Sequence, residues 1–150
     1  MKQGPERELV ARYLDRAKAG GKALGLTGFA VTELPESRAS AATARKAEEA
    51  RAIGDHLPGG TTLVALDEHG ASLGSAPFAR KLSAWRDAGR EAVSFVIGGA
   101  DGIDPDLLKS AELTLSFSSL TWPHQLVRIM LAEQLYRVTT ILSGHPYHRE

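Results

Sequence analysis

Two short apolar runs, separated by one helical segment, constrain the fold of this 150-residue chain more than any other feature. Residues 61–66 and 92–97 are rich in Val, Ile and Leu, as is typical of strands buried on both faces of a parallel sheet. Between them, Ser75 is placed to cap a helix that ends before Gly89. A strand, a helix and a second strand form a βαβ unit, so we predict a three-layer α/β domain with a mostly parallel sheet.

The segment before this unit predicts two helices and one further strand. Pro5 opens a helix that ends at residues 20–21, both glycine. Residues 24–34 place apolar residues in near alternation, which predicts a strand. Residues 37–57 are rich in alanine and charged residues, which favours a surface helix.

After the unit, we expect a short helix over residues 104–112, a strand over 113–120 and a long last helix opened by Pro123. Residues 145–150 form a tail. Apolar residues cover more than one face of the last helix: Leu126, Val127, Ile129, Met130, Leu131, Leu135, Val138, Ile141 and Leu142. One face can pack on the sheet and the other on a second copy, so we predict a homodimer through this helix.

Composition excludes several classes of protein. Hydrophobic residues make up 43% and charged residues 24%, which suits a single domain over residues 1–150. Lys and Arg number 18, as do Asp and Glu, so the overall basic excess of many nucleic-acid binders is missing. The sequence has no cysteine, which excludes disulfides and thiol catalysis. Without a long apolar run or a signal peptide, we expect a soluble cytoplasmic protein.

Ligands of open parallel sheets bind beyond the carboxyl ends of the strands. The candidate binding segments are therefore the predicted loops 67–74, 98–104 and 120–124. The glycines of the second loop allow backbone to approach a ligand, or simply make a tight turn. Its acids, Asp101 and Asp104, with nearby Asp106, disfavour a phosphate-rich cofactor.

The same acids leave a magnesium site open as an alternative, although helix capping explains them as well. The histidines show no HExxH spacing and no serine lies in a GxSxG elbow, so we reject a zinc or serine hydrolase. The terminal His145, Tyr147, His148 and Arg149 form an aromatic and basic cluster of the kind that stacks on a base and holds a phosphate. A frayed polar terminus is the alternative.

Four ordered motifs carry a resemblance to a known family. They are IGGADG at 97–102, LTWPHQLVR at 120–128, AEQLYR at 132–137 and HPYHRE at 145–150. Together they resemble the ribosomal RNA large subunit methyltransferase H family, which belongs to the SPOUT, or α/β-knot, methyltransferases.

The resemblance implies S-adenosylmethionine-dependent methylation of N3 of a pseudouridine in 23S ribosomal RNA, performed by a homodimer with a C-terminal trefoil knot. It implies a cofactor pocket built mainly from backbone groups. By position, its residues are Leu66, Gly98, Gly99, Ser118, Ser119, Leu120, Thr121, Trp122 and Pro123. Members of the family usually begin with a short apolar strand before the region of residues 2–4. We expect this strand to be missing here, through a late start codon or a truncated form, with a cost in stability.

The chemistry assigns roles to the tail. The imide proton at N3 must leave, and His148, or a water held near it, is the candidate acceptor. Arg149 and Tyr147 are expected to position the RNA, and His124, Arg128 and His145 to add RNA contacts. Because the chain is neutral, we expect recognition of the assembled ribosome, with no membrane and no metal involved.

Two alternatives stay open. One is a non-catalytic dimeric nucleotide-binding or interaction module with the same layers, since fold alone does not fix function. The other is a magnesium-dependent phosphoryl-transfer domain. Titration with S-adenosylmethionine distinguishes both from a methyltransferase.

Overall fold

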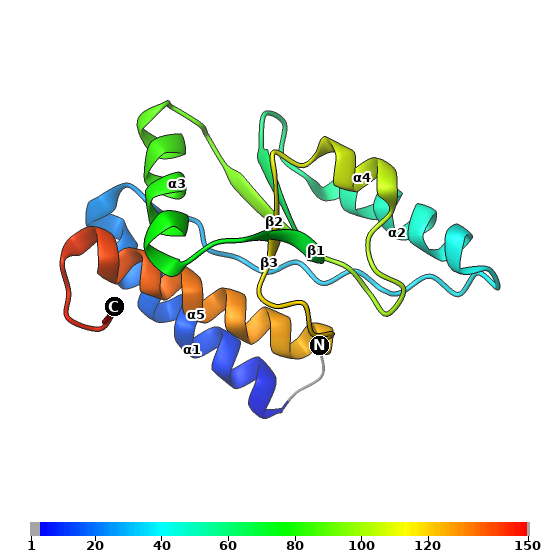
Figure 1. The fold of residues 1–150 in the computed structure, drawn as a ribbon, viewed down its shortest axis with the longest axis horizontal. Coiled ribbons are helices and arrows are strands. Elements are labelled where there is room, and N and C mark those ends of the chain that lie inside the picture. The colour runs from blue at the N-terminus through cyan, green and yellow to red at the C-terminus, as the bar shows by residue number, and fades with distance from the viewer. Residues whose placement is uncertain (1–3, 150) are drawn as a thin grey trace. The chain divides into compact units, whose positions relative to one another are not determined.

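The computed structural model describes residues 4–149, in which helices and short strands alternate (Figure 1). In chain order the elements are α1 (Pro5–Gly21), the 3-10 helix η1 (Lys22–Leu24), α2 (Ala42–His56), β1 (Thr62–Ser72), α3 (Ser75–Asp87), β2 (Val93–Ile97), α4 (Pro105–Ser110), β3 (Leu113–Ser116) and α5 (His124–Ser143). The contacts group into two compact units. One contains residues 33–73 and 90–124, and the other contains 4–32, 74–89 and 125–149. We call them the sheet unit and the helical unit.

The sheet unit is built on a parallel sheet with strand order β2-β1-β3. The central strand pairs on both sides, which explains its continuous apolar sequence: Val64 and Ala65 are completely buried. Leu66 pairs with Ile97 of β2 and Leu115 of β3. The predicted α/β class with a parallel sheet is therefore confirmed.

β1 continues beyond its predicted end. The loop predicted over residues 67–74 is wrong, because pairing with β3 resumes at Ala71 and Ser72 after a register shift. The crossing there is tight: a Cβ on Gly70 would lie 2.5 Å from the carbonyl oxygen of Thr114. β3 is shorter than the predicted 113–120, because the Ser116 hydroxyl donates to the carbonyls of Glu68 and Ser118 and the chain turns away.

Two helices complete the sheet unit. α4 begins as predicted, since the Asp104 carboxylate accepts a hydrogen bond from the Asp106 N–H, but it ends at Ser110 instead of 112. α2 begins at Ala42, five residues later than predicted. The preceding segment folds back along the helix, where the Ser37 hydroxyl donates to Glu48 and its backbone N–H to Glu49.

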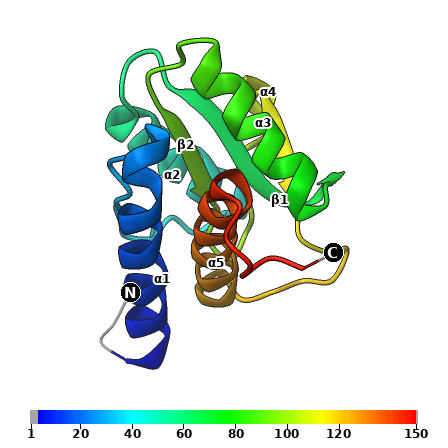
Figure 2. The same ribbon diagram turned by 90° about the vertical axis from the view of Figure 1, so that its left-hand side faces the viewer.

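The helical unit packs α1 against α5, which lie side by side in Figures 1 and 2. Val10 and Leu14 of α1 and Ala132 of α5 form its buried centre, surrounded by Tyr13, Phe29, Ile129 and Leu135. The predicted first helix is confirmed. α3 is confirmed as well, but Ser75 is not its cap. Gly74 holds that position and the Ser75 hydroxyl donates to Gln134 of α5.

The strand predicted over residues 24–34 is wrong. η1 ends at Leu24, and the following residues form no regular element. Alternation predicts a strand only where one face is buried against a partner, and here Val31 is 52% exposed and pairs with no strand. The chain is held instead by single contacts, such as the Leu26 N–H donating to the carbonyl of Gly21.

α5 ends with two hydrogen bonds typical of a Schellman motif. The Gly144 N–H donates to the carbonyl of Ile141, and the His145 N–H to that of Thr140. The tail follows, as predicted, through residue 149.

Residues 1–3, next to the predicted absent strand, and Glu150 lie outside the described residues. Within the described part of the chain, no helix combines the length and apolarity needed to cross a membrane. The trefoil knot and the homodimer stay predictions.

Candidate functional site

The candidate cofactor residues lie on three segments of the sheet unit: β1 itself, the chain after β2 and the chain after β3. Because β1, β2 and β3 are parallel, their carboxyl ends meet at one edge of the sheet. Leu66 closes the regular pairing of β1 and is only 8% exposed, so its side chain belongs to the core. The other candidates lie in the chain after β2 and after β3.

The chain after β2 makes a tight turn over residues 98–102, which we call the glycine turn. The Gly102 N–H donates to the carbonyl of Gly99 at 3.0 Å, and these two residues form an isolated antiparallel bridge. A Cβ on Gly98 would lie 2.7 Å from the backbone of Gly102, so a side chain there forces the turn open. Only a glycine fits at this position.

The chain after β3, residues 117–123, is ordered by side-chain to backbone bonds. The Ser118 N–H donates to the Ser116 hydroxyl, and the Leu120 N–H to the Ser118 hydroxyl. The Thr121 hydroxyl donates to the carboxylate of Glu68 at 2.9 Å, which joins this loop to β1. Large apolar side chains are nevertheless exposed here, with Leu120 63% and Trp122 40% accessible.

The acidic side chains in and just after the glycine turn have partners within the protein. Asp101 accepts two hydrogen bonds from the Arg45 guanidinium, which holds the pKa of its carboxyl below the usual range. Asp104 caps α4. Among the described residues, no group of three or more His, Cys, Asp or Glu side chains is arranged to hold a metal ion. The structure therefore gives the magnesium alternative no support.

The tail is attached to α5 by a network in the helical unit. Glu133 accepts from Arg137 Nε and Nη2 at 3.1 and 2.6 Å and from the Tyr147 hydroxyl at 2.9 Å. Arg137 Nη1 lies 3.1 Å from His148 Nδ1, and the guanidinium covers the Tyr147 ring at 4.9 Å from its centroid. We call Glu133, Arg137, Tyr147 and His148 the tail network.

The network bears on the protonation of Tyr147 and on the tautomer that His148 has when its ring is neutral. Burial, followed by the hydrogen bond to Glu133, raises the pKa of Tyr147 to about 12, so the phenol stays protonated at neutral pH. A guanidinium only donates, so His148 Nδ1 accepts from Arg137 and the neutral ring carries its proton on Nε2. In this tautomer, His148 Nε2 is a donor and has no lone pair to offer.

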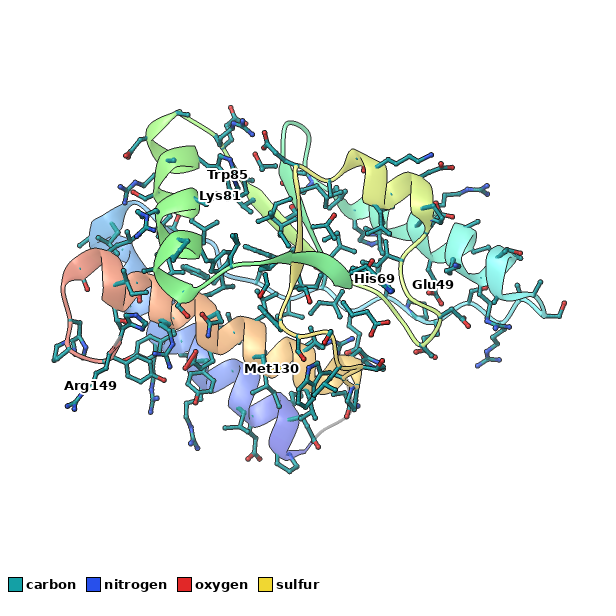
Figure 3. The ribbon with its side chains drawn as sticks, viewed as in Figure 1. Glu49, His69, Lys81, Trp85, Met130 and Arg149 are labelled. Carbon is teal, nitrogen blue, oxygen red and sulfur yellow. The ribbon has the colours of Figure 1, made fainter. Side chains whose placement is uncertain are left out.

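The remaining candidate residues are dispersed. Arg149 is exposed and its side chain projects from the tail (Figure 3). His145 is exposed, and its ring nitrogen Nδ1 accepts from the Tyr147 N–H. Arg128 is half-buried in α5, and this burial lowers the pKa of its guanidinium. His124 begins α5 and belongs to the sheet unit, together with Trp122 and Pro123.

Three partners were not predicted from the sequence. The sequence could have indicated Glu133, because it precedes Arg137 by four residues on a predicted helix, which is the spacing of an ion pair. No sequence pattern indicates the other two, Glu68, which accepts from Thr121, and Arg45, which pairs with Asp101. Their partners lie 53 and 56 residues away in the sequence.

Comparison with known proteins gives consistent results over the whole chain. A family model described as "Predicted SPOUT methyltransferase" matches residues 1–148. Ribosomal RNA large subunit methyltransferase H of Bradyrhizobium diazoefficiens is 56% identical over 149 residues, covering 99% of this chain and 93% of that protein. The proteins of the same name from Rhodopseudomonas palustris (strain BisB18) and Allorhizobium ampelinum are each 57% identical, with the same coverage.

Proposed function

Since the chain belongs to the SPOUT methyltransferases, we propose that it methylates N3 of a pseudouridine in 23S ribosomal RNA with S-adenosylmethionine as methyl donor. The relatives compared above, each more than half identical, are named for methylation of large-subunit ribosomal RNA. The observation that carries the proposal is the ordered, glycine-rich and partly apolar edge at the carboxyl ends of β1, β2 and β3.

The residues at this edge fit the proposed donor. S-adenosylmethionine has an adenine ring, a ribose and a cationic sulfonium, but no phosphate. Backbone N–H and C=O groups of residues 98–102 and 118–121 would pair with the adenine edge, while Leu120 and Trp122 would cover its ring. The carboxylate of Glu68 favours a cation over a phosphate.

The donor, when bound, supplies a methyl group that is already activated. The protein's own contribution is to orient the target nitrogen for in-line attack and to keep water away from the reacting atoms. We assign the holding of the RNA to Arg149 and Tyr147, with further contacts from His124, Arg128 and His145. The free guanidinium end of Arg149 suits a phosphate, because it is exposed at the end of an anchored tail.

N3 of the target must lose its proton as it gains the methyl group. Arg137 donates a hydrogen bond to Nδ1 of His148. The neutral ring then carries its hydrogen on Nε2, which is a donor. In the proposed reaction, a water that accepts from Nε2 takes the imide proton and passes it to solvent. We therefore assign His148 the holding of that water, and direct transfer to the ring requires the Arg137 contact to open first.

We propose that the protein acts as a homodimer through α5 on the assembled large subunit in the cytoplasm. Leu126 of this helix is 41% exposed, and several of its other apolar residues are only half-buried. The chain has no net charge, so free RNA would be bound weakly and a preassembled ribosomal surface would add the missing contacts.

Calorimetric titration with S-adenosylmethionine, together with a light-scattering mass, tests the proposal. We expect one donor bound per chain in a particle of twice the 16.0 kDa chain mass. A folded protein that binds no donor would contradict the methyltransferase activity and favour a non-catalytic interaction module.

A further inference from the structure

The glycine turn is held from one side by a single arginine of α2. Arg45 Nε donates to Asp101 Oδ2 at 2.7 Å, and Arg45 Nη2 donates to Asp101 Oδ1 at 3.0 Å. The two bonds run side by side from one guanidinium to one carboxylate, which is the bidentate geometry that fixes both distance and orientation. Both side chains are mostly covered, with 29% and 24% of their surface exposed.

The same guanidinium also holds the segment before α2. Arg45 Nη1 donates to the backbone carbonyls of Ala39 and Ser40 at 3.1 and 3.0 Å. Four of its N–H groups are thus used, and they join the first turn of α2, residues 39–40 and the glycine turn. An isolated ion pair on the surface contributes little to stability. A planar guanidinium whose four hydrogen bonds link three segments sets the positions of these segments relative to one another.

The glycine turn needs such an external contact because it has few side chains of its own. Gly98, Gly99 and Gly102 have none, and Asp101 is its only charged residue. Glu49, one helical turn after Arg45, approaches the turn as well: a Cβ on Gly99 would lie 3.2 Å from Glu49 Oε1. Figure 3 shows Glu49 on α2 facing this part of the chain.

We propose that Arg45 is a positioning residue for donor binding: through Asp101 it holds the backbone of residues 98–102 in the conformation that receives S-adenosylmethionine. This inference rests on the proposed function and names a determinant of donor affinity within it. Arg45 contacts the turn through Asp101, and the proposal gives it no contact of its own with the donor. Lysine cannot replace it, because an ammonium has no planar fork to meet both carboxylate oxygens.

The test uses Arg45→Lys, Arg45→Gln, Asp101→Asn and the double variant R45Q/D101N of the full chain. Arg51→Lys is the matched control, since Arg51 is an exposed arginine of the same helix. We would measure the dissociation constant of S-adenosylmethionine by calorimetry, KM and kcat for methyl transfer, and hydrogen exchange of the Gly102 amide.

We expect each single variant at the pair to raise the dissociation constant and the KM for the donor about tenfold, with kcat at saturating donor little changed. The double variant should be no weaker than the single ones, because the two side chains act as one unit. Exchange at the Gly102 amide should accelerate in the pair variants and stay unchanged in Arg51→Lys.

Unchanged donor affinity in Asp101→Asn, a fall in kcat with an unchanged KM, or additive effects in the double variant would overturn the positioning role. Should the Arg45 variants fail to fold, Asp101→Asn decides alone, because it keeps the shape of the side chain. A wild-type protein that binds no donor overturns the proposed function itself, and the positioning role with it. Normal wild-type binding with unaffected variants overturns only the role of Arg45.

Discussion

Tyr147 shows how one tail residue can be structural and still serve the proposed reaction. Its hydroxyl donates to Glu133, its ring lies 4.6 Å from that of Tyr136, and Arg137 covers its face. These contacts hold the chain next to His148, while Arg149 is exposed. The anchoring of Tyr147 therefore helps to order its two neighbours, His148, which we assign to holding the water, and Arg149, which we assign to the RNA.

The raised pKa of Tyr147 predicts a loss of stability in strong alkali. The phenol ionises near pH 10.0 when unperturbed and at about 12 in the folded protein, so the folded state favours the protonated form. The stability that the protonated phenol of Tyr147 gives the folded protein is complete below pH 10 and is lost as the pH approaches about 12. Urea denaturation over this interval should show the loss in the wild-type protein but not in Tyr147→Phe. Parallel pH profiles of the two proteins would contradict the assignment.

Arg149→Ala should abolish methyl transfer while sparing donor binding, because the side chain is exposed and supports no part of the fold. Calorimetry with S-adenosylmethionine and a methyl-transfer assay on ribosomes separate the two effects. Arg7, also an exposed arginine of the helical unit, provides the matched control Arg7→Ala. Undiminished turnover in Arg149→Ala would remove Arg149 from the substrate site.

At the scale of elements, the second half of β1 is defined by the close crossing at Gly70. Replacing Gly70 with alanine puts a Cβ against the backbone of Thr114, which cannot move without disturbing β3. We predict that Gly70→Ala lowers the free energy of unfolding by about 2 kcal/mol, measured by urea denaturation. Gly59→Ala, which places its Cβ in open space, should change it little. Equal stability of the two variants would contradict this reading of the crossing.

The elements that the sequence predicts well are those marked by residues within or next to the element itself. Asp104 and the following proline mark the start of α4, and Pro5 marks that of α1. The errors depend on distant contacts. The extension of β1 comes from pairing with β3, some 44 residues away between Ala71 and Leu115. Alternation in residues 24–34 predicts a strand, but no strand among residues 4–149 pairs with this segment.

The candidate site divides in the same way. Gly98 and Gly99 are predictable from their place between a strand and a helix, and Tyr147 to Arg149 from their unusual composition at the end of the chain. The contacts of Asp101 with Arg45 and of Thr121 with Glu68 are invisible in one sequence, because they join segments that only the fold brings together.

At the scale of the whole molecule, α5 determines the proposed assembly. Leu126 is 41% exposed on a helix whose other large apolar residues are buried or half-buried. We predict that Leu126→Arg converts the dimer to a monomer in light scattering and removes methyl transfer. Val31→Arg changes another exposed apolar residue, 52% accessible, and should leave the dimer intact. A wild-type monomer, or a dimer that survives Leu126→Arg, would contradict the interface.

The proposed activity of the whole molecule is methylation of a pseudouridine in large-subunit ribosomal RNA. The most direct measurement incubates the purified protein with S-adenosylmethionine carrying a labelled methyl group and with ribosomes that lack the modification. The labelled nucleoside is then identified by mass spectrometry. We expect one labelled N3-methylpseudouridine in the large-subunit RNA. No label in the RNA, or label on a different nucleoside, would contradict it.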